Sequence, residues 1–299
     1  MKTIITLIKT LLLSHFPSGS AINYHDGRLY IIGDDANELL ILDNNYNHVT
    51  AIKVFNYKDK RIPKAQKPDL ETSVILDKSG QQHLLALGSA ATKERETAIL
   101  FNLPPDKHKP HQISYTPFIN RLKALPEINI EGAAVTGKYF ILSNRGNETN
   151  PINHFIITTP DFLEQQETAP INIVKLTTPA VIQGFAGVSE LCYAEKEDIL
   201  FITLSREATG NAYDDGAIGD SYLGWIYDIS KKITDPEISL DGVVNLSESD
   251  LAFKGEKVEG VCISGRSDNG WILDLVADND KGASRLFRVK VVLDNFPKK

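Results

Sequence analysis

The sequence predicts an all-β protein, a five-bladed β-propeller of four-stranded antiparallel blades. Helical periodicity is nearly absent, and short runs of Ile, Leu, Val, Tyr and Phe are bounded by Gly, Asp, Asn and Pro. A longer unit, made of several such runs, also repeats five times along the chain. We therefore expect residues 1–299 to form a single propeller domain.

Each repeat begins with a similar short segment. The five blade starts lie near Ser20, Glu71, Glu131, Ser189 and Glu259. An apolar strand, a turn, a second strand, a polar loop and a third strand follow each start. The predicted second strands are Leu29 to Gly33, Leu84 to Gly88, Tyr139 to Ser143, Ile199 to Leu204 and Trp271 to Leu275. A fourth strand is expected in the first four units, which completes four propeller blades.

The fifth unit ends after its third strand, near Val292. We expect Thr3 to Leu13 to supply the missing strand and close the ring, which would remove the exposed sheet edges. The same segment also resembles the start of a signal peptide, but Lys9 interrupts its apolar run and no Ala-x-Ala site follows. If this segment is a strand of the propeller, we expect a cytoplasmic protein. If it is part of a signal peptide, we expect an exported one. The run is too short to be a transmembrane segment.

Composition excludes several classes of protein. The chain of 299 residues is 42% hydrophobic and 24% charged, as expected for a folded globular protein. Its net charge of −7 argues against binding to nucleic acid or to an anionic membrane, because both require a basic face. The two cysteines are too few for a disulfide scaffold or a structural zinc site. Nothing in the sequence predicts an oligomeric state.

The blade starts carry the main candidate site. The first strand of each propeller blade lines the central channel, so Ser20, Glu71, Glu131, Ser189 and Glu259 should converge on the axis. Three carboxylates in a narrow channel repel one another unless they are protonated, paired or bound to a cation. Their oxygens suit Ca²⁺, which takes six to eight oxygen ligands. We therefore predict a Ca²⁺ site on the axis.

Two alternatives to this metal ring remain open. The glutamates can bond backbone amides of a neighbouring blade or pair with Lys64, Lys67 or Lys257. In the fourth blade, Glu190 can replace Ser189 as the residue that faces the channel.

The segment from Ser20 to Tyr30, followed by Asp34-Asp35, resembles the first blade of the calcium-activated nucleotidases, which are five-bladed apyrases. In that family a ring of Ser, Glu, Glu, Ser and Glu, one residue per blade, holds a central calcium ion. The five blade starts reproduce this order, so the resemblance also implies Ca²⁺. Glu131-Gly132 and Glu259-Gly260 resemble blade starts of phytase-like propellers. The likeness is confined to the first blade and the repeat starts.

The chain as a whole is similar to an uncharacterised bacterial propeller family that has no established activity. The similarity rests on four short motifs, which are Ser18-Gly19-Ser20, Gly33-Asp34-Asp35, Lys67 to Glu71 and Ile130 to Ala133.

Charged loops predict a second part of the site at one mouth of the channel. Arg95, Arg145 and Arg206 follow the second strands of three blades and suit an anion, because guanidinium groups form forked hydrogen bonds. The other candidate ligand-binding residues are Lys64, Lys67 and Asn147. Alternatively, the charged loop residues pair with one another.

Two functions follow from these residues. The first is a propeller that holds Ca²⁺ and binds a small anionic ligand at one mouth. The alternative is a metal-dependent hydrolase of phosphoanhydrides or phosphoesters, in which the arginines hold phosphate and the catalytic residues Asp34 or Asp35 orient a metal-bound water. The sequence contains no recognisable Ser or Cys nucleophile motif.

Overall fold

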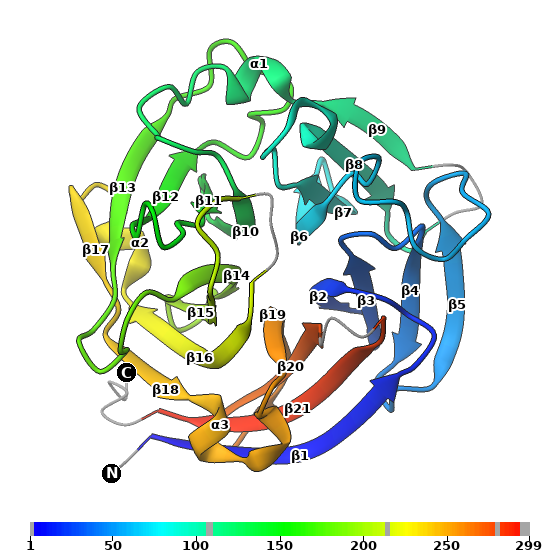
Figure 1. Ribbon diagram of the computed structural model, residues 1–299, viewed down its shortest axis with the longest axis vertical. Helices are drawn as coiled ribbons and strands as arrows, with labels where there is room; N and C mark the ends of the chain where they lie inside the picture. Colours follow the sequence, from blue (N-terminus) through cyan, green and yellow to red (C-terminus); the bar gives the residue numbers. More distant parts are fainter. Residues whose placement is uncertain (1–2, 106–109, 213–215, 279–281, 294–299) are drawn as a thin grey trace.

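The computed structural model describes residues 3–105, 110–212, 216–278 and 282–293. Five antiparallel sheets stand in a ring around a central axis (Figure 1). The predicted five-bladed β-propeller is therefore confirmed.

The first strand of each blade lies nearest the axis, and the later strands lie progressively further out (Figure 1). The first strands are β2 (Gly19–His25), β6 (Leu70–Lys78), β10 (Ile130–Thr136), β14 (Gly187–Ala194) and β19 (Lys257–Ser267). The second strands are β3 (Arg28–Gly33), β7 (Gln81–Gly88), β11 (Tyr139–Asn144), β15 (Ile199–Glu207) and β20 (Gly270–Asp278). The third strands are β4 (Glu38–Asp43), β8 (Thr97–Asn102), β12 (Asn153–Thr158), β16 (Ile218–Tyr227) and β21 (Ser284–Val292). The outer strands of blades one to four are β5 (His48–Lys53), β9 (His111–Ser114), β13 (Asn172–Thr177) and β18 (Gly242–Asn245).

The N-terminal strand closes the ring as the sequence predicts. Strand β1 (Ile4–Leu13) runs antiparallel to β21, with Ile5 opposite Val291 and Leu11 opposite Leu286. Blade five is thus built from both ends of the chain. Blade three carries a strand that the repeat did not predict, because β17 (Glu237–Ser239) joins the outer side of β13 in parallel.

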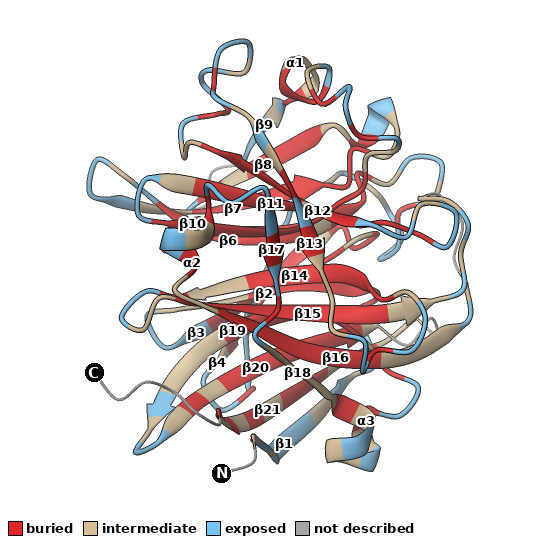
Figure 2. Ribbon diagram, turned by 90° about the vertical axis from the view of Figure 1, so that its left-hand side faces the viewer, coloured by how far each residue is buried: buried red, intermediate tan, exposed pale blue. Residues whose placement is uncertain are grey.

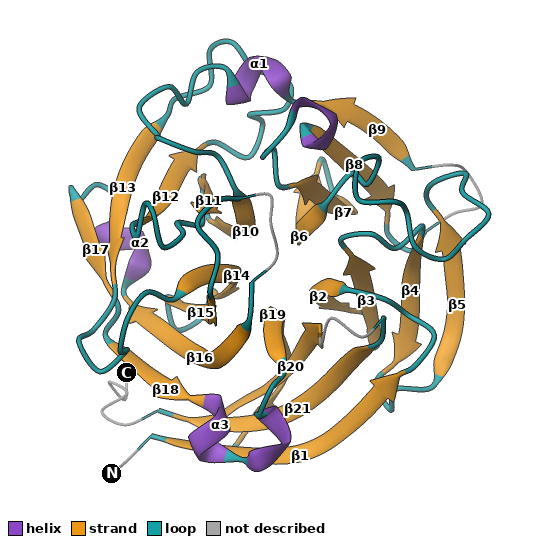
Figure 3. Ribbon diagram, viewed as in Figure 1, coloured by secondary structure: helices purple, strands orange, loops and turns teal. Residues whose placement is uncertain are grey.

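Helices are short and lie between strands (Figure 3). They are α1 (Thr116–Ile119), α2 (Ile229–Lys232), α3 (Leu246–Ser249) and the 3₁₀ turns η1 (Lys93–Arg95) and η2 (Leu251–Phe253). None of the helices in the described residues is long and apolar enough to cross a membrane.

The hydrophobic core is divided among the gaps between blades, where the strands are largely buried (Figure 2). Five clusters of buried side chains fill the five gaps, including the one between blades five and one. Between blades four and five, for example, the ring of Phe201 meets that of Trp271 edge to face, with centroids 5.4 Å apart. Because every blade shares its apolar faces with two neighbours, the ring is stabilised as a whole.

Candidate functional site

A β-bulge at the start of every blade determines what faces the axis. The pairing of the first strand with the second shifts by one residue in all five blades. The residues skipped by these shifts are Ser20, Glu71, Glu131, Ser189 and Glu259. A bulge leaves one residue outside the ladder and redirects its side chain. The five predicted ring residues therefore occupy one structurally equivalent position.

Two of the bulges are followed by a glycine because the chains approach closely there. A Cβ atom at Gly132 would lie 2.6 Å from Ser143 Oγ, and one at Gly260 would lie 2.7 Å from Val276 Cγ1 and 2.9 Å from Ile22 N. The Glu-Gly pairs of blades three and five thus reflect tight packing directly after the bulge.

Four of the five ring residues line one axial cavity of about 80 Å³, which has room for an ion and a few waters. The exception is Ser189, whose Oγ accepts a hydrogen bond from Arg145 Nη1 at 3.0 Å. The carboxylates that line the axial cavity belong to Asp34, Asp69, Glu71, Glu131, Glu207, Glu259 and Asp278. The cations that line it are Lys67, Arg95, Arg145 and Lys257. Among the described residues, seven acidic groups therefore face four basic groups.

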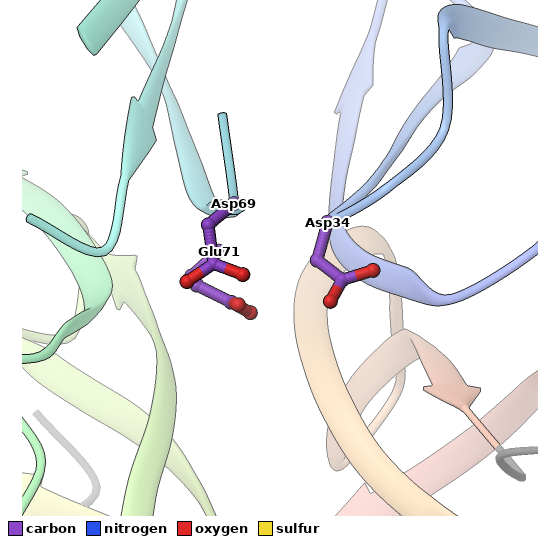
Figure 4. A group of neighbouring side chains, drawn as sticks. All are labelled: Asp34, Asp69 and Glu71. Carbon is purple, nitrogen blue, oxygen red and sulfur yellow. The ribbon is translucent and has the colours of Figure 1, made fainter. Parts of the chain in front are cut away.

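One group of ion pairs joins blades one and two. The Lys67 ammonium contacts Asp34, and it lies 2.6 Å from Asp69 Oδ1. Arg95 Nη1 donates to Asp69 Oδ2 at 2.7 Å, so both oxygens of Asp69 are engaged. Figure 4 shows Asp34 facing Asp69 and Glu71 across the gap between the two blades. An oxygen from each of these three carboxylates lies within 4.8 Å of the others.

A second group of ion pairs joins blades three, four and five. Lys257 Nζ lies 2.8 Å from both Glu207 Oε2 and Glu259 Oε1. Arg145 approaches Glu207 Oε2 at 3.4 Å and Glu131 Oε2 at 3.7 Å. Asn129 Nδ2 donates to the other oxygen of Glu131 at 2.7 Å. The expected pairing with Lys257 is thus present for Glu259.

Several oxygens in the axial cavity have no donor among the described residues. Asp34 Oδ1 and Glu259 Oε2 are buried without a hydrogen-bond partner. The Glu71 carboxylate forms no hydrogen bond or ion pair within the described part of the chain. These oxygens belong to three different blades. They are therefore able to accept a donor or a cation held on the axis.

The pKa values of several carboxyl groups in the axial cavity reflect the excess of acidic over basic groups there. Burial raises the pKa of Glu71 well above its ordinary value, and the charges of Asp69 and Glu131 add to the effect. Burial likewise raises the pKa of Glu131 to about 8 and that of Asp34 to about 6. Glu207 is the exception, because Lys257 and Arg145 outweigh its burial and lower its pKa to about 2. Without a bound cation, protons on the first three carboxyls would reduce the repulsion.

The remaining predicted residues do not all reach the axial cavity. Asp35 and Lys64 line an adjoining cavity. Asn147 lines the axial cavity, but its Nδ2 donates to Glu127 Oε2 and its Oδ1 accepts from two backbone amides. Arg206 lies on β15 beside Gly184, outside both cavities, so the three arginines do not converge.

Glu190, the alternative ring residue of blade four, lies one position past the bulge. Its carboxylate accepts hydrogen bonds from Thr72 Oγ1 at 2.7 Å, Ala133 N at 3.0 Å and Leu191 N at 2.9 Å. It is not among the residues that line the axial cavity. Glu190 therefore joins blades two, three and four by hydrogen bonds.

The cavity also contains residues that were not proposed as site residues from the sequence. They include Asp69, Asn129, Glu207, Lys257 and Asp278. Asp69, Asn129 and Lys257 each stand two positions before a ring residue, as Ser18 does in blade one. In four of the five blades, the residue two positions before the repeat start therefore lines the cavity, and this spacing is visible in the sequence.

Comparison with known proteins identifies the family. A model of a family of unknown function, DUF6929, matches residues 15–291. The chain belongs to the DUF6929 family. No curated protein matches it.

Solved structures resemble this DUF6929 protein in fold. Myxococcus xanthus glutaminyl cyclase matches with a TM-score of 0.53 at 11% identity, covering 98% of this chain and 99% of its own. A thermostable family-43 glycoside hydrolase matches with a TM-score of 0.51 at 11% identity, covering 96% and 91%. A family-43 β-1,3-galactosidase gives 0.53 at 9% identity, covering 92% of this chain and 56% of its own. At these identities the likeness shows the propeller fold alone, and no link to nucleotidases or phytases is established.

Proposed function

We propose that this DUF6929 propeller binds one divalent cation, Ca²⁺, in the axial cavity. The observation that carries the proposal is the imbalance, within the described parts of the chain, of seven carboxylates against four cationic side chains around a space of about 80 Å³. Like charges enclosed together favour either protonation or a bound cation. A divalent ion would replace protons on Glu71 and Glu131 and offset two of the three excess negative charges.

The ligands for this ion come from four blades. Asp34 Oδ1, Glu259 Oε2 and the Glu71 carboxylate lack donors, and Glu131 Oε2 has only a distant cation at 3.7 Å. Oxygens that share one Ca²⁺ lie about 2.3–2.6 Å from it, so the spacing of at most 4.8 Å between oxygens of Asp34, Asp69 and Glu71 is compatible with an ion at that end of the cavity. Ser20 Oγ donates to Leu70 O and keeps its lone pairs for a ligand role. We leave Ser189 out, because Arg145 already donates to it.

The same contacts support a cation more than the small anionic ligand that the sequence suggested. Arg95, Arg145 and Lys67 are each held by carboxylates, which already satisfy their charge. An anion in the axial cavity would also meet the excess of acidic groups. The phosphate-hydrolase alternative remains a prediction that no contact described above favours.

Calorimetric titration of chelator-treated protein with CaCl₂ tests the proposal. We expect one ion per chain and a rise in melting temperature with Ca²⁺. Glu71→Gln and Glu259→Gln should each weaken binding at least about tenfold. Glu256→Gln is the matched control, because Glu256 is equally buried in blade five but pairs with Arg285 outside the axial cavity. The absence of binding heat, together with the same melting temperature in Ca²⁺ and in chelator, would refute it.

A further inference from the structure

A second cavity adjoins the axial cavity at its mouth. This side pocket has a volume of about 300 Å³ and is lined by Ser18, Asp34, Asp35, Arg61 to Lys64, Lys67 and Asp278. Its charge differs from that of the axial cavity, because three cations face three carboxylates among the residues that the structure describes. A balanced set of opposite charges suits a ligand that itself carries both signs.

Backbone contacts fix the segments that form the side pocket. Ile62 is buried, its amide donates to Asp35 O at 2.7 Å, and Arg61 forms a β-bridge with Ala36. These backbone contacts hold the segment that carries Arg61 and Lys64 against the loop that carries Asp34 and Asp35. The two charged walls are thus held in place before any ligand binds.

The acidic wall contains acceptors that need a donor. The Asp35 side chain is only 7% exposed, and its Oδ2 accepts from Arg61 Nε at 2.6 Å. Its Oδ1 is buried with no hydrogen-bond partner among the described residues, as is Asp34 Oδ1 beside it. Buried carboxylate oxygens without donors are costly, and an ammonium group supplies up to three N–H donors.

The basic wall of the side pocket offers positive charges for a carboxylate group. The Arg61 side chain is 56% exposed, and its bond to Asp35 uses Nε. Its two terminal nitrogens can still make the forked contact that guanidinium groups form with a carboxylate. Lys64 adds a second positive charge on the same segment.

We propose that the side pocket binds a free α-amino acid, with its ammonium group at Asp35 and its carboxylate at Arg61 and Lys64. The volume is at the lower end of the range for small-molecule sites, about 300–1,000 Å³, which fits a molecule of this size. The site is separate from the proposed Ca²⁺ site, although Asp34 borders both cavities.

The test is a thermal-shift screen of the whole protein against the twenty common amino acids at about 10 mM, followed by calorimetry on the best binder. We expect saturable binding of at least one amino acid. Its α-amide and its analogue without the amino group should each bind about tenfold more weakly or worse. Equal affinity for either analogue, or no binding by any amino acid, would overturn the proposal.

Variants locate the site. Arg61→Gln and Asp35→Asn should each weaken binding about tenfold. Arg61 is half-exposed, so its variant tests the proposal even if Asp35→Asn does not fold. Arg266→Gln is the matched control, since Arg266 also pairs with a carboxylate, that of Glu197, but lies outside the side pocket. Binding should persist in chelator. If chelator abolishes amino-acid binding and Arg61→Gln leaves the affinity unchanged, the ligand binds at the metal ion instead of in the side pocket.

Discussion

Arg145 of blade three occupies the space that a side chain of Gly187 would fill in blade four. A Cβ atom at Gly187 would lie 2.3 Å from Arg145 Nε and 2.7 Å from its Cγ and Cζ. The arginine therefore crosses from one blade to the next, where Nη1 reaches Ser189 Oγ and Nη2 reaches Ser205 O at 3.3 Å. Gly187 is thus what allows a buried guanidinium to cover the bulge of blade four.

Replacing Gly187 by alanine should displace this guanidinium. We expect Gly187→Ala to lower the free energy of unfolding by about 1–3 kcal/mol, because the extra methyl group overpacks a filled space. Urea unfolding measures the change. Gly265→Ala is the control, since its Cβ would lie 3.6 Å from its nearest neighbour, Ile272. If the two variants have equal stability, the proposed role of Gly187 is wrong.

Lys257 holds two carboxylates together in a nearly buried position, with only 17% of its side chain exposed. Lys257→Met should destabilise the chelator-treated protein by about 3–5 kcal/mol, because it removes the cation that Glu207 and Glu259 share and leaves only Arg145 beside Glu207. Under the proposed function, Ca²⁺ should recover part of this loss. Lys175→Met removes a half-exposed pair with Glu237 and should cost less than about 1 kcal/mol. Chemical unfolding with and without Ca²⁺ distinguishes these outcomes.

Stability should depend on pH through Glu131. Its pKa of about 8 in the folded protein exceeds the ordinary glutamate value, so folding favours the protonated form. This contribution is complete below the ordinary pKa and is lost as pH rises through about 8. In chelator, the melting temperature should therefore fall between about pH 5 and pH 8. Glu131→Gln should flatten the profile, and a melting temperature that rises over this range would contradict the assignment.

Binding of Ca²⁺ should show the opposite dependence. Since the ion competes with protons on Glu71 and Glu131, its affinity should increase as pH rises and binding should release protons. Calorimetry in buffers of different ionisation enthalpy measures the number released. Proton uptake, or no exchange, would argue against these two ligands.

Glu190 provides a test of the polar contacts that join three blades. Its carboxylate accepts two backbone N–H groups and the Thr72 hydroxyl at 3.0 Å or less. All three bonds reach Oε1, and Ser73 N donates to Oε2 at 3.4 Å. In Glu190→Gln an NH₂ group replaces one of these oxygens and faces its donor, so we expect a loss of about 1–3 kcal/mol in the free energy of unfolding. Glu195→Gln, a change at an exposed glutamate on the same hairpin, should leave stability within about 0.5 kcal/mol. Equal unfolding midpoints would show that the contacts contribute little.

The fold could be predicted because a propeller repeats one local pattern. Apolar strands at similar positions in five units indicate five blades, and the missing strand of the last unit indicates closure by Thr3 to Leu13. The ring residues were found for the same reason, since Glu71, Glu131 and Glu259 recur at one place in the unit. Repetition makes such positions visible without any knowledge of the backbone.

The mouth of the channel could not be predicted in the same way. Loops differ between blades, so the position of Arg206 beside Gly184 depends on local turns rather than on the repeat. The contact of Arg145 with Ser189 depends on the missing side chain of Gly187, which is a relation between blades. The bulges, too, are a feature of strand pairing, and the strand pattern alone does not reveal which residue is skipped.

The pairing of β1 with β21 has a consequence for synthesis of the chain. The strand Ile4–Leu13 leaves the ribosome long before its partner Ser284–Val292 exists. Until then its apolar residues have no sheet to join, and blades one and five cannot pack. The complete ring can therefore form only near the end of translation, and a nascent chain must protect this strand from other partners in the meantime.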